Sequence, residues 1–275
     1  RPDHPVELPD PDGGLETKIT PVIMVGGAGT RLWPISRETM PKQFIAIMDD
    51  GHSTFQGTLT RITGPNFNQP IIITSNDFRF VVAEQMRSLG VQGEIVLEPE
   101  RRDSAAAVAV AAVMVEARQA GSLCLVLAGD HVIDGDAAFV HDCTIAASQA
   151  AGGKIMTIGI VPTFPASGYG YIAAGTALAS DRSFVVDRFV EKPDAATAQA
   201  MLADGRFLWN AGIFLFTART MIEAFRAHAP EFLEPVRAAL AEARQDLGFL
   251  RLAPEPWEAL PDLSIDYAVM EKTDR

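Results

Sequence analysis

The sequence predicts an α/β protein built on a Rossmann-like, doubly wound and mostly parallel mixed sheet. Short apolar segments rich in β-branched residues alternate with longer helix-like segments over the first half of the chain. These apolar segments are hydrophobic at both odd and even positions, which is typical of strands that are buried on both faces. The apolar share of 48% is ample for such a core. The alternation therefore predicts helices on both faces of the sheet.

The first half of the sequence accounts for four strands of this sheet. They are expected at 19–27, 70–75, 93–99 and 122–130. Helices are expected between them at roughly 53–63, 76–89 and 103–120. The last of these helices has Asp103 or Ser104 as its N-cap and Gly121 just past its end, because side-chain oxygens cap the first free amides and glycine commonly follows the last turn.

After residue 150 the pattern changes to strands with few helical residues between them. Strand-like segments occur at 155–161, 169–178, 184–193 and 207–216, and they predict mixed or antiparallel additions to the sheet. Helices are expected again at about 218–228 and 230–246. Residues 1–18 are rich in proline and acidic side chains and are expected to form a flexible N-terminal tail. Residues 19–275 are expected to form one domain.

The charge and the cysteine content limit the partners and the compartment. The net charge of −12 and the pI of about 4.8 argue against a broad nucleic-acid-binding face. The longest apolar segment, residues 104–115, is too short and too rich in alanine to span a bilayer. Cys124 and Cys143 lie in apolar segments without metal-binding spacing, which favours a reducing compartment. We therefore expect a cytoplasmic protein that binds neither nucleic acid nor membrane.

The stretch "MVGGAGTRLWPISRETMPKQF", residues 24–44, follows the first strand. It contains three glycines, Gly26, Gly27 and Gly29. Their amides can point at phosphate oxygens, but a dinucleotide fingerprint would need a third spaced glycine where Leu32 stands, and a P-loop signature is absent. The glycines alone leave a plain turn and a phosphate cradle as equal alternatives. Arg31 and Lys42 beyond them favour phosphate.

This stretch resembles the signature of the sugar-1-phosphate nucleotidyltransferases. Further motifs follow in the family order, namely "LEPERRDSAAAVAVAA", "LAGDHVI", "GYGYI", "FVEKP", "WNAGIF" and "SIDYAVMEKT". The resemblance extends from about residue 19 to the last few residues. The chain departs from the family's Asn-Thr-Ala-Pro at residues 103–106. It also stops before the C-terminal β-helix of the family and the isomerase domain of some members, so the β-helix is expected to be absent or truncated.

The resemblance implies a nucleotidyltransferase fold of the GT-A-like type, with 19–275 as the catalytic domain. The wording "GTRLWP" and "PKQF" is most similar to members that transfer a guanylyl group from GTP to α-D-mannose 1-phosphate, giving GDP-mannose for polysaccharide biosynthesis. These two substrates are the implied partners, and a homo-oligomer is compatible with the family. The alternatives are another nucleoside triphosphate and hexose 1-phosphate pair, or a non-catalytic homologue that senses nucleotide sugars.

The resemblance also assigns roles to individual residues of this sequence. The catalytic positions are matched by Arg31, Lys42 and Asp130. The nucleotide-binding positions are matched by Gly26, Gly27, Gly29, Thr30, Glu98 and Ser104. The sugar-phosphate-binding positions are matched by Gly168, Tyr169, Gly170, Glu191, Lys192, Asn210 and Gly212. The implied cofactor is Mg²⁺, with Asp130 and Asp266 as its ligands.

The residue types suit the chemistry of such a transfer. A sugar 1-phosphate is already an anionic nucleophile, so the reaction requires no general base. It requires alignment of two polyanions and neutralisation of charge at the α-phosphate as pyrophosphate leaves. A sensing homologue would be expected to lose the phosphate cations or the metal carboxylates, whereas this sequence keeps Arg31, Lys42, Asp130 and Asp266. Their presence favours catalysis.

Several of these residues also have purely structural interpretations. Asp130 would otherwise be a turn or N-cap residue, and Asp266 would otherwise cap a helix over "YAVMEK". Glu191 and Lys192 would otherwise be an exposed pair, although Pro193 suggests that the strand ends there and lets both side chains reach one cleft. We expect three aromatic residues to lie in the core and not to stack on a ligand, namely Trp209, Phe214 and Phe216. No chemistry is assigned to His131.

Overall fold

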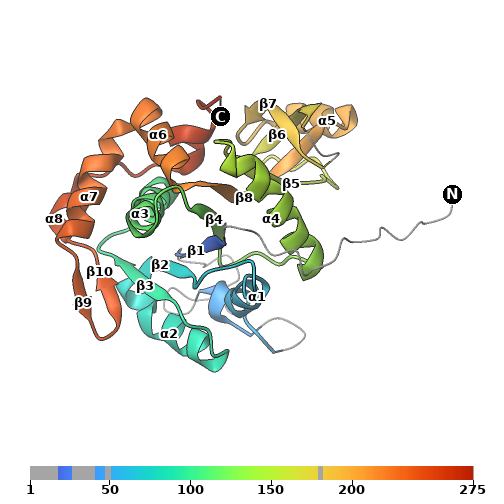
Figure 1. The fold of residues 1–275 in the computed structure, drawn as a ribbon. Helices are drawn as coiled ribbons and strands as arrows, with labels where there is room; N and C mark the ends of the chain where they lie inside the picture. Colours follow the sequence, from blue (N-terminus) through green and yellow to red (C-terminus); the bar gives the residue numbers. More distant parts are fainter. Residues whose placement is uncertain (1–17, 27–40, 47–50, 179–181, 275) are drawn as a thin grey trace.

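The computed structural model describes residues 18–26, 41–46, 51–178 and 182–274, and its centre is a ten-stranded mixed sheet (Figure 1). Four strands of this sheet run parallel to one another, in the spatial order β4-β1-β2-β3. They are β1 (Ile19–Val25), β2 (Ile71–Ser75), β3 (Glu94–Glu98) and β4 (Leu123–Ala128). The mostly parallel, doubly covered sheet predicted from the first half of the sequence is therefore confirmed.

Helices cover both faces of the parallel strands, because successive strand residues point to opposite sides. In β1, for example, Val22 packs into one hydrophobic cluster and Ile23 into the other. The first face is covered by α3 (Asp103–Arg118), α6 (Ala218–His228), α7 (Leu233–Ala241) and the short α8 (Pro254–Glu258). The second face is covered by α1 (Thr54–Arg61), α2 (Arg79–Ser88) and α4 (Asp136–Ala151).

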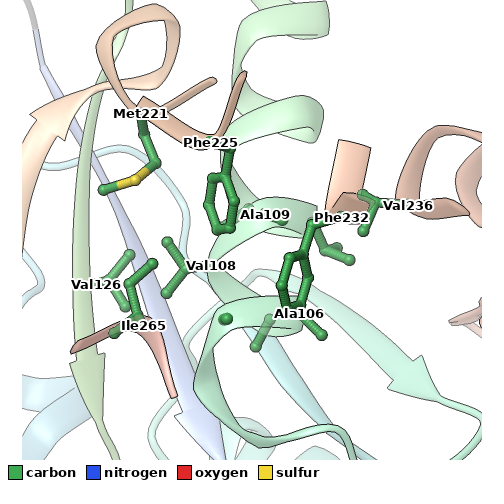
Figure 2. Packing of buried hydrophobic residues seen from close by; sticks show 14 of the residues in the cluster. Ala106, Val108, Ala109, Val126, Met221, Phe225, Phe232, Val236 and Ile265 are labelled. Carbon is green, nitrogen blue, oxygen red and sulfur yellow. The ribbon is translucent and has the colours of Figure 1, made fainter. Parts of the chain in front are cut away.

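The alanine-rich segment forms α3 and is buried between the sheet and the C-terminal helices. Figure 2 shows Phe225 and Phe232 packed beside Ala106 and Ala109 of this helix. Small alanine side chains let neighbouring helices approach closely. Because α3 is enclosed between the sheet and these helices, it is apolar on all sides. None of the described helices is long and apolar enough to cross a membrane.

Four further strands extend the sheet with antiparallel pairing, as expected from the change of pattern after residue 150. They are β5 (Met156–Ile160), β6 (Tyr171–Ala177), β7 (Phe184–Val190) and β8 (Phe207–Thr217). The helix α5 (Ala195–Asp204) packs its Ala198 and Met201 against Tyr171 and Trp209. Figure 1 shows this group at the opposite end of the sheet from β9 and β10.

Strand β8 joins the two parts of the sheet. One of its edges pairs with β5. Its other edge pairs with β6 through Phe207–Trp209 and with β4 through Phe214–Thr217. Residues 211–213 belong to neither of these described ladders, so β4 and β6 diverge beside the middle of β8. This divergence lies beyond the carboxyl end of β4, where open α/β sheets commonly bind ligands.

Several local predictions were wrong. Residues 136–151 and 195–204 form α4 and α5, which were not predicted. The helix expected over 230–246 is a 3₁₀ turn, η4 (Pro230–Phe232), followed by α7, and it ends at Ala241. A hairpin of β9 (Arg244–Asp246) and β10 (Phe249–Arg251) follows, and β10 pairs in parallel with β3. Its turn residues Leu247 and Gly248 both have positive φ, which suits a tight hairpin.

The N-cap predicted for α3 was also wrong. The residue at the N-cap position is Arg102, and it makes no capping side-chain hydrogen bond. Asp103 has a φ of 53°, and its carboxylate accepts from the amide of Ser104. The Ser104 hydroxyl instead accepts from the amide of Ile265, 2.9 Å away. The Ser104 hydroxyl therefore makes a long-range contact instead of capping the helix.

Candidate active site

The first strand leads directly into the predicted phosphate-binding stretch. Gly26 follows β1 and is exposed, and a Cβ atom built on it meets no atom within 4 Å. Packing of the described residues therefore does not require a glycine there. The other predicted residues of this stretch, Gly27, Gly29, Thr30 and Arg31, lie outside the described residues.

Lys42 and Asp130 form an ion pair, with Lys42 Nζ 2.9 Å from Asp130 Oδ2. Both side chains are 36% exposed, so the pair remains accessible to a ligand. Lys42 begins the 3₁₀ turn η2 (Lys42–Phe44), and Asp130 follows the end of β4. The structure thus brings together a predicted phosphate cation and a predicted metal ligand at the carboxyl edge of the parallel strands.

The turn that carries Lys42 is anchored through Phe44. The Phe44 ring packs edge-on to Phe55 at a centroid distance of 5.9 Å and also contacts Phe78. Gln85 Nε2 donates to the Phe44 carbonyl oxygen at 2.9 Å, and Gln85 Oε1 accepts from the hydroxyl of Ser53. These contacts attach η2 to α1 and α2.

His131 is mostly enclosed beside this pair. Burial lowers the pKa of its imidazole, and Asp130 opposes this shift, while the cations Arg61 and Lys42 add to it. Its Nδ1 has no hydrogen-bond partner among the described residues. That His131 carries no chemistry of its own stays a prediction.

Two of the residues predicted to bind the nucleotide, Glu98 and Ser104, lie on β3 and α3. Glu98 ends β3, and burial raises the pKa of its carboxyl to about 8, against the opposing charge of Arg101. The hydroxyl of Ser104 is engaged by the amide of Ile265, next to Asp266. Ser104 therefore connects α3 to the segment that carries a predicted metal ligand.

The predicted sugar site converges around Asn210 of β8. Asn210 Nδ2 donates to Asp266 Oδ1 at 3.0 Å, and Asn210 Oδ1 accepts from the amide of Gly212 at 3.2 Å. Thr157 Oγ1 of β5 also lies 3.1 Å from Asn210 Oδ1. Both ends of the amide are thus held. Thr157 was not predicted, because nothing in its strand-like segment distinguishes it from other sheet residues.

Gly170 and Glu191 lie on the other side of Asn210. The amide of Asn210 donates to the Gly170 carbonyl oxygen at 2.8 Å. A Cβ atom on Gly170 would lie only 2.5 Å from Glu191 Oε2, so the carboxylate occupies the space that a side chain at residue 170 would fill. Residues from β8, from the loop before β6 and from the end of β7 therefore meet at one place.

Several carboxylates gather in this cluster. Burial raises the pKa of Glu191, with Lys192 opposing the shift and Glu271 adding to it. Burial and the neighbouring Glu191 raise the pKa of Asp266 to about 6, against the hydrogen bond from Asn210. Such carboxylates can accept hydrogen bonds from sugar hydroxyls or bind a cation, since either would compensate their lost hydration.

Glu191 and Lys192 lie on the same side of the chain although they are adjacent. β7 ends at Val190, and Lys192 has a φ of 43°, which breaks the alternation of the strand. Lys192 Nζ lies 3.7 Å from Glu191 Oε1, and the lysine side chain is 62% exposed, compared with 14% for the glutamate. The predicted ending of the strand before Pro193 is confirmed.

The loop that leads into β6 carries Gly168 and Tyr169. The Tyr169 ring packs edge-on to Phe164 and Trp209 with centroid distances of 6.2 and 5.2 Å, and Tyr169 is 48% exposed. The hydroxyl of Tyr171 donates to the Ala166 carbonyl oxygen at 2.8 Å and fastens the loop. Burial confirms the expected core positions of Trp209, Phe214 and Phe216.

The two groups of predicted residues lie beyond the same end of the β4–β8 ladder. The last described pair of this ladder is Val126 with Phe214. Asp130 follows Val126 in the chain and Asn210 precedes Phe214, so in this antiparallel pair both residues leave the ladder at the carboxyl end of β4. In the described part of the chain no three His, Cys, Asp or Glu side chains gather in a group that could hold a metal by themselves.

Comparisons with known proteins agree with this architecture. The family model described as Nucleotidyl transferase matches residues 20–258. A mannose-1-phosphate guanylyltransferase of Sinorhizobium fredii is 48% identical over 259 residues, covering 93% of this chain and 50% of the relative. The xanthan biosynthesis protein XanB of Xanthomonas campestris is 45% identical over 256 residues, covering 93% of this chain and 54% of the relative.

A crystal structure from Thermus thermophilus, described as a mannose-1-phosphate geranyltransferase, superposes with a TM-score of 0.78 at 33% identity. The match covers 94% of this chain and 72% of that one. The chain spans about half the length of the curated relatives it matches.

Proposed function

The chain belongs to the nucleotidyl transferase family, and from this premise we propose that it transfers a guanylyl group from GTP to α-D-mannose 1-phosphate. The products are GDP-mannose and pyrophosphate. One observation carries the proposal. The Lys42–Asp130 pair, and Asn210 with its partner Asp266, lie beyond the same end of the β4–β8 ladder. The names of relatives at 45–48% identity support the choice of substrates.

In the proposed reaction an oxygen of the mannose 1-phosphate attacks the α-phosphorus of GTP. The bond between the α-phosphorus and the bridging oxygen to the β-phosphate breaks, and pyrophosphate leaves with that electron pair. No proton needs to be removed from the nucleophile. Lys42 is suited to neutralise charge on the departing phosphates, because its ammonium is accessible and is held in place by Asp130.

The residues present fit a divalent cation, and we propose Mg²⁺. Asp130 is accessible and lies at a strand end, while the raised pKa of Asp266 reflects a buried carboxyl that lacks compensating positive charge. Magnesium is usually bound by one or two carboxylates together with substrate phosphates and water. Asp130 and Asp266 would hold it, and when bound it would supply positive charge beside the α-phosphate.

The remaining residues of the cluster suit the sugar phosphate. Glu191 can accept hydrogen bonds from sugar hydroxyls, because its carboxylate is mostly buried and aimed at Gly170. Lys192 is exposed above it and can pair with the phosphate of the sugar. Asn210 is held at both ends of its amide and can position either partner. We place the reaction in the cytoplasm, which agrees with Cys124 and Cys143 being buried free thiols.

A substrate panel tests the proposal directly. Four nucleoside triphosphates are each combined with several hexose 1-phosphates, and release of pyrophosphate is measured in the presence of Mg²⁺. We expect the fastest turnover with GTP and mannose 1-phosphate. Faster turnover of a different pair would contradict the proposed base or sugar. Binding of nucleotide sugars without turnover of any pair would indicate a sensing protein instead.

A further inference from the structure

The segment from Gly129 to Asp136 carries Asp130 and connects β4 to α4. A carboxylate on a connecting segment binds a cation well only if its backbone is held, because ligands must be kept close to their productive geometry. The described contacts of this segment come mainly from one helix, α1, which packs beneath it on the second face of the sheet.

The N-terminal end of α1 holds the segment before Asp130. Thr54 Oγ1 donates to the Gly129 carbonyl oxygen at 3.2 Å, and both partners are buried. The amide of Gly129 in turn donates to the Met24 carbonyl oxygen of β1 at 3.1 Å. A Cβ atom on Gly129 would meet Phe55 of α1 at 3.3 Å, so the helix packs directly against this backbone.

The C-terminal end of α1 holds the segment after Asp130. Arg61 is the last residue of α1, and its side chain is only 4% exposed. Arg61 Nε donates to Asp136 Oδ1 at 2.8 Å, and Nη2 donates to the Ile133 carbonyl oxygen at 3.2 Å. The guanidinium also lies 5.8 Å from the centroid of the Phe139 ring. Arg61 therefore connects the segment and the start of α4 to the end of α1.

The same helix also supports the partner of Asp130. Phe55 of α1 packs against Phe44, and Ser53, the N-cap of α1, bonds the glutamine that holds the Phe44 carbonyl oxygen. Phe44 ends the turn that begins with Lys42. Both members of the Lys42–Asp130 pair are thus positioned from α1.

Stability alone does not explain a buried arginine at this position. Burying a guanidinium costs about as much free energy as its ion pair returns. Arg61 Nη1 has no hydrogen-bond partner among the described residues, and Asp136 is 58% exposed, so water can solvate that carboxylate without Arg61. An apolar side chain of similar length would fill the same space with little loss of stability.

We propose that Arg61 is a positioning residue that, through Ile133 and Asp136, holds Asp130 in the orientation in which it binds the divalent cation. The inference rests on the proposed function only in taking Asp130 as a cation ligand. It predicts that the role of Arg61 appears in cation affinity and in kcat, and that folding and the affinity for sugar phosphate are little changed.

Binding of Mn²⁺, measured by electron paramagnetic resonance with GTP present and sugar phosphate absent, tests the inference without turnover. Arg61→Met should weaken Mn²⁺ binding by about 10- to 100-fold, as is usual when a group that orients a metal ligand is lost. Arg61→Lys should restore part of the affinity, because an ammonium can reach one of the two acceptors. Asp136→Asn should give a smaller weakening, and it keeps the test available if Arg61→Met does not fold.

Two reference variants make the outcomes distinguishable. Asp130→Asn marks the signal expected when the ligand itself is lost. Thr217→Val removes the N-cap hydroxyl of α6, at the opposite end of β8, and should lower the melting temperature without changing Mn²⁺ affinity. Wild-type Mn²⁺ affinity in Arg61→Met, together with lost affinity in Asp130→Asn, would overturn the inference. Unchanged affinity in Asp130→Asn would overturn it as well, whereas absence of GTP turnover by the wild-type protein would overturn only the proposed function.

Discussion

The parallel part of the sheet and the antiparallel part around β5 to β8 differ in how deeply the strands beside the candidate site residues are buried. In β1 six of the seven residues are buried, whereas the first five residues of β7 are exposed. Most of the exposed large hydrophobic side chains also belong to the antiparallel part, for example Val161, Phe184 and Val186. Asp130 therefore follows a part of the sheet that is buried on both faces, whereas Glu191 follows a strand that is largely exposed.

Charge is also distributed differently in the two regions. Lys42 and Asp130 compensate one another at 2.9 Å. In the antiparallel part, burial and the charge of Glu191 raise the pKa of Asp266, against the hydrogen bond from Asn210. Burial also raises the pKa of Glu191, against the charge of the exposed Lys192. In the proposed reaction the two parts would have different roles. The parallel part would supply charge that is already paired for the chemical step, and the antiparallel part would supply carboxylates whose charges become compensated when substrate and cation bind.

The largest effect is expected from Asp130→Asn in the parallel part. The variant should fold, because Asp130 is partly exposed, but kcat at saturating Mg²⁺ should fall by about 1,000-fold. Steady-state rates of pyrophosphate release, with the melting temperature as a check of folding, provide the measurement. Asp134→Asn, in the same segment, is the matched control and should remain active. Near-normal rates in Asp130→Asn would remove this residue from the metal site.

A smaller loss is expected from Lys42→Ala. Its charge matters most as pyrophosphate departs, so kcat should fall by about 100-fold and the affinity for GTP should also weaken. Initial rates at varied GTP and varied sugar phosphate separate the two effects. Lys154→Ala removes an exposed lysine elsewhere and should behave as the wild type. If only the KM for sugar phosphate rose, Lys42 would act on the sugar phosphate, together with the residues of the antiparallel part, and not on GTP.

Lys192→Ala probes the antiparallel part and should act on binding. A charge-assisted contact to phosphate contributes roughly 1.5–3 kcal/mol, so the KM for mannose 1-phosphate should rise by at least about tenfold. Titration calorimetry with Mg-GTP alone should show little change, and the nearby exposed Lys272→Ala provides the control. Equal weakening of both ligands would mean that Lys192 supports the whole cleft, and unchanged binding of mannose 1-phosphate would leave it as an exposed strand-end residue.

The smallest effect on activity at neutral pH is expected from Glu98→Gln. Burial raises the pKa of Glu98 to about 8 from an ordinary value of 4.5, so the carboxyl is mostly protonated at pH 7 and glutamine resembles it. The folded protein keeps a proton that the unfolded chain releases. The wild-type free energy of unfolding should therefore fall, relative to that of the variant, as the pH rises from about 4.5 to about 8.

Urea unfolding of both proteins at several pH values measures this difference. If the free energies of unfolding of the two proteins change with pH in the same way, Glu98 has an ordinary pKa. The contrast between a charge-compensated parallel part and a charge-rich antiparallel part would then become sharper. Diverging profiles would show that the parallel part also contains a carboxyl without enough compensating charge.

The parallel strands, and the positions at which candidate functional residues follow them, could be predicted from the local sequence. Strands buried on both faces must be apolar at every position, so "ITPVIMV" and "LCLVLA" indicate their own environment. Asp130 and Gly26 were predictable as strand-end residues for the same reason. The end of β7 before Glu191 was also a local property, because proline at 193 stops the ladder.

Two elements that were not predicted, α5 and the 244–251 hairpin, nevertheless have local signals in the sequence. Asp194 caps α5 by accepting from the amide of Thr197, and Gly205 ends that helix with positive φ. The turn of the 244–251 hairpin likewise ends on a glycine with positive φ, Gly248. α4 begins after a left-handed Gly135 without a capping side chain, so its start has no comparable signal.

The contacts between residues far apart in the sequence depend on the packing of the whole chain. Asn210 and Asp266 are separated by 56 positions, and Arg61 and Asp136 by 75. Such pairs do not follow from the periodicity of the sequence. They depend on how β8 pairs with β4 and β6 and on how α1 packs against the segment after β4. The same packing turned Ser104 from a predicted cap into a contact with Ile265. Local sequence sets which residues are buried and where strands end, whereas the pairing of polar groups across the site follows from packing of the whole sheet.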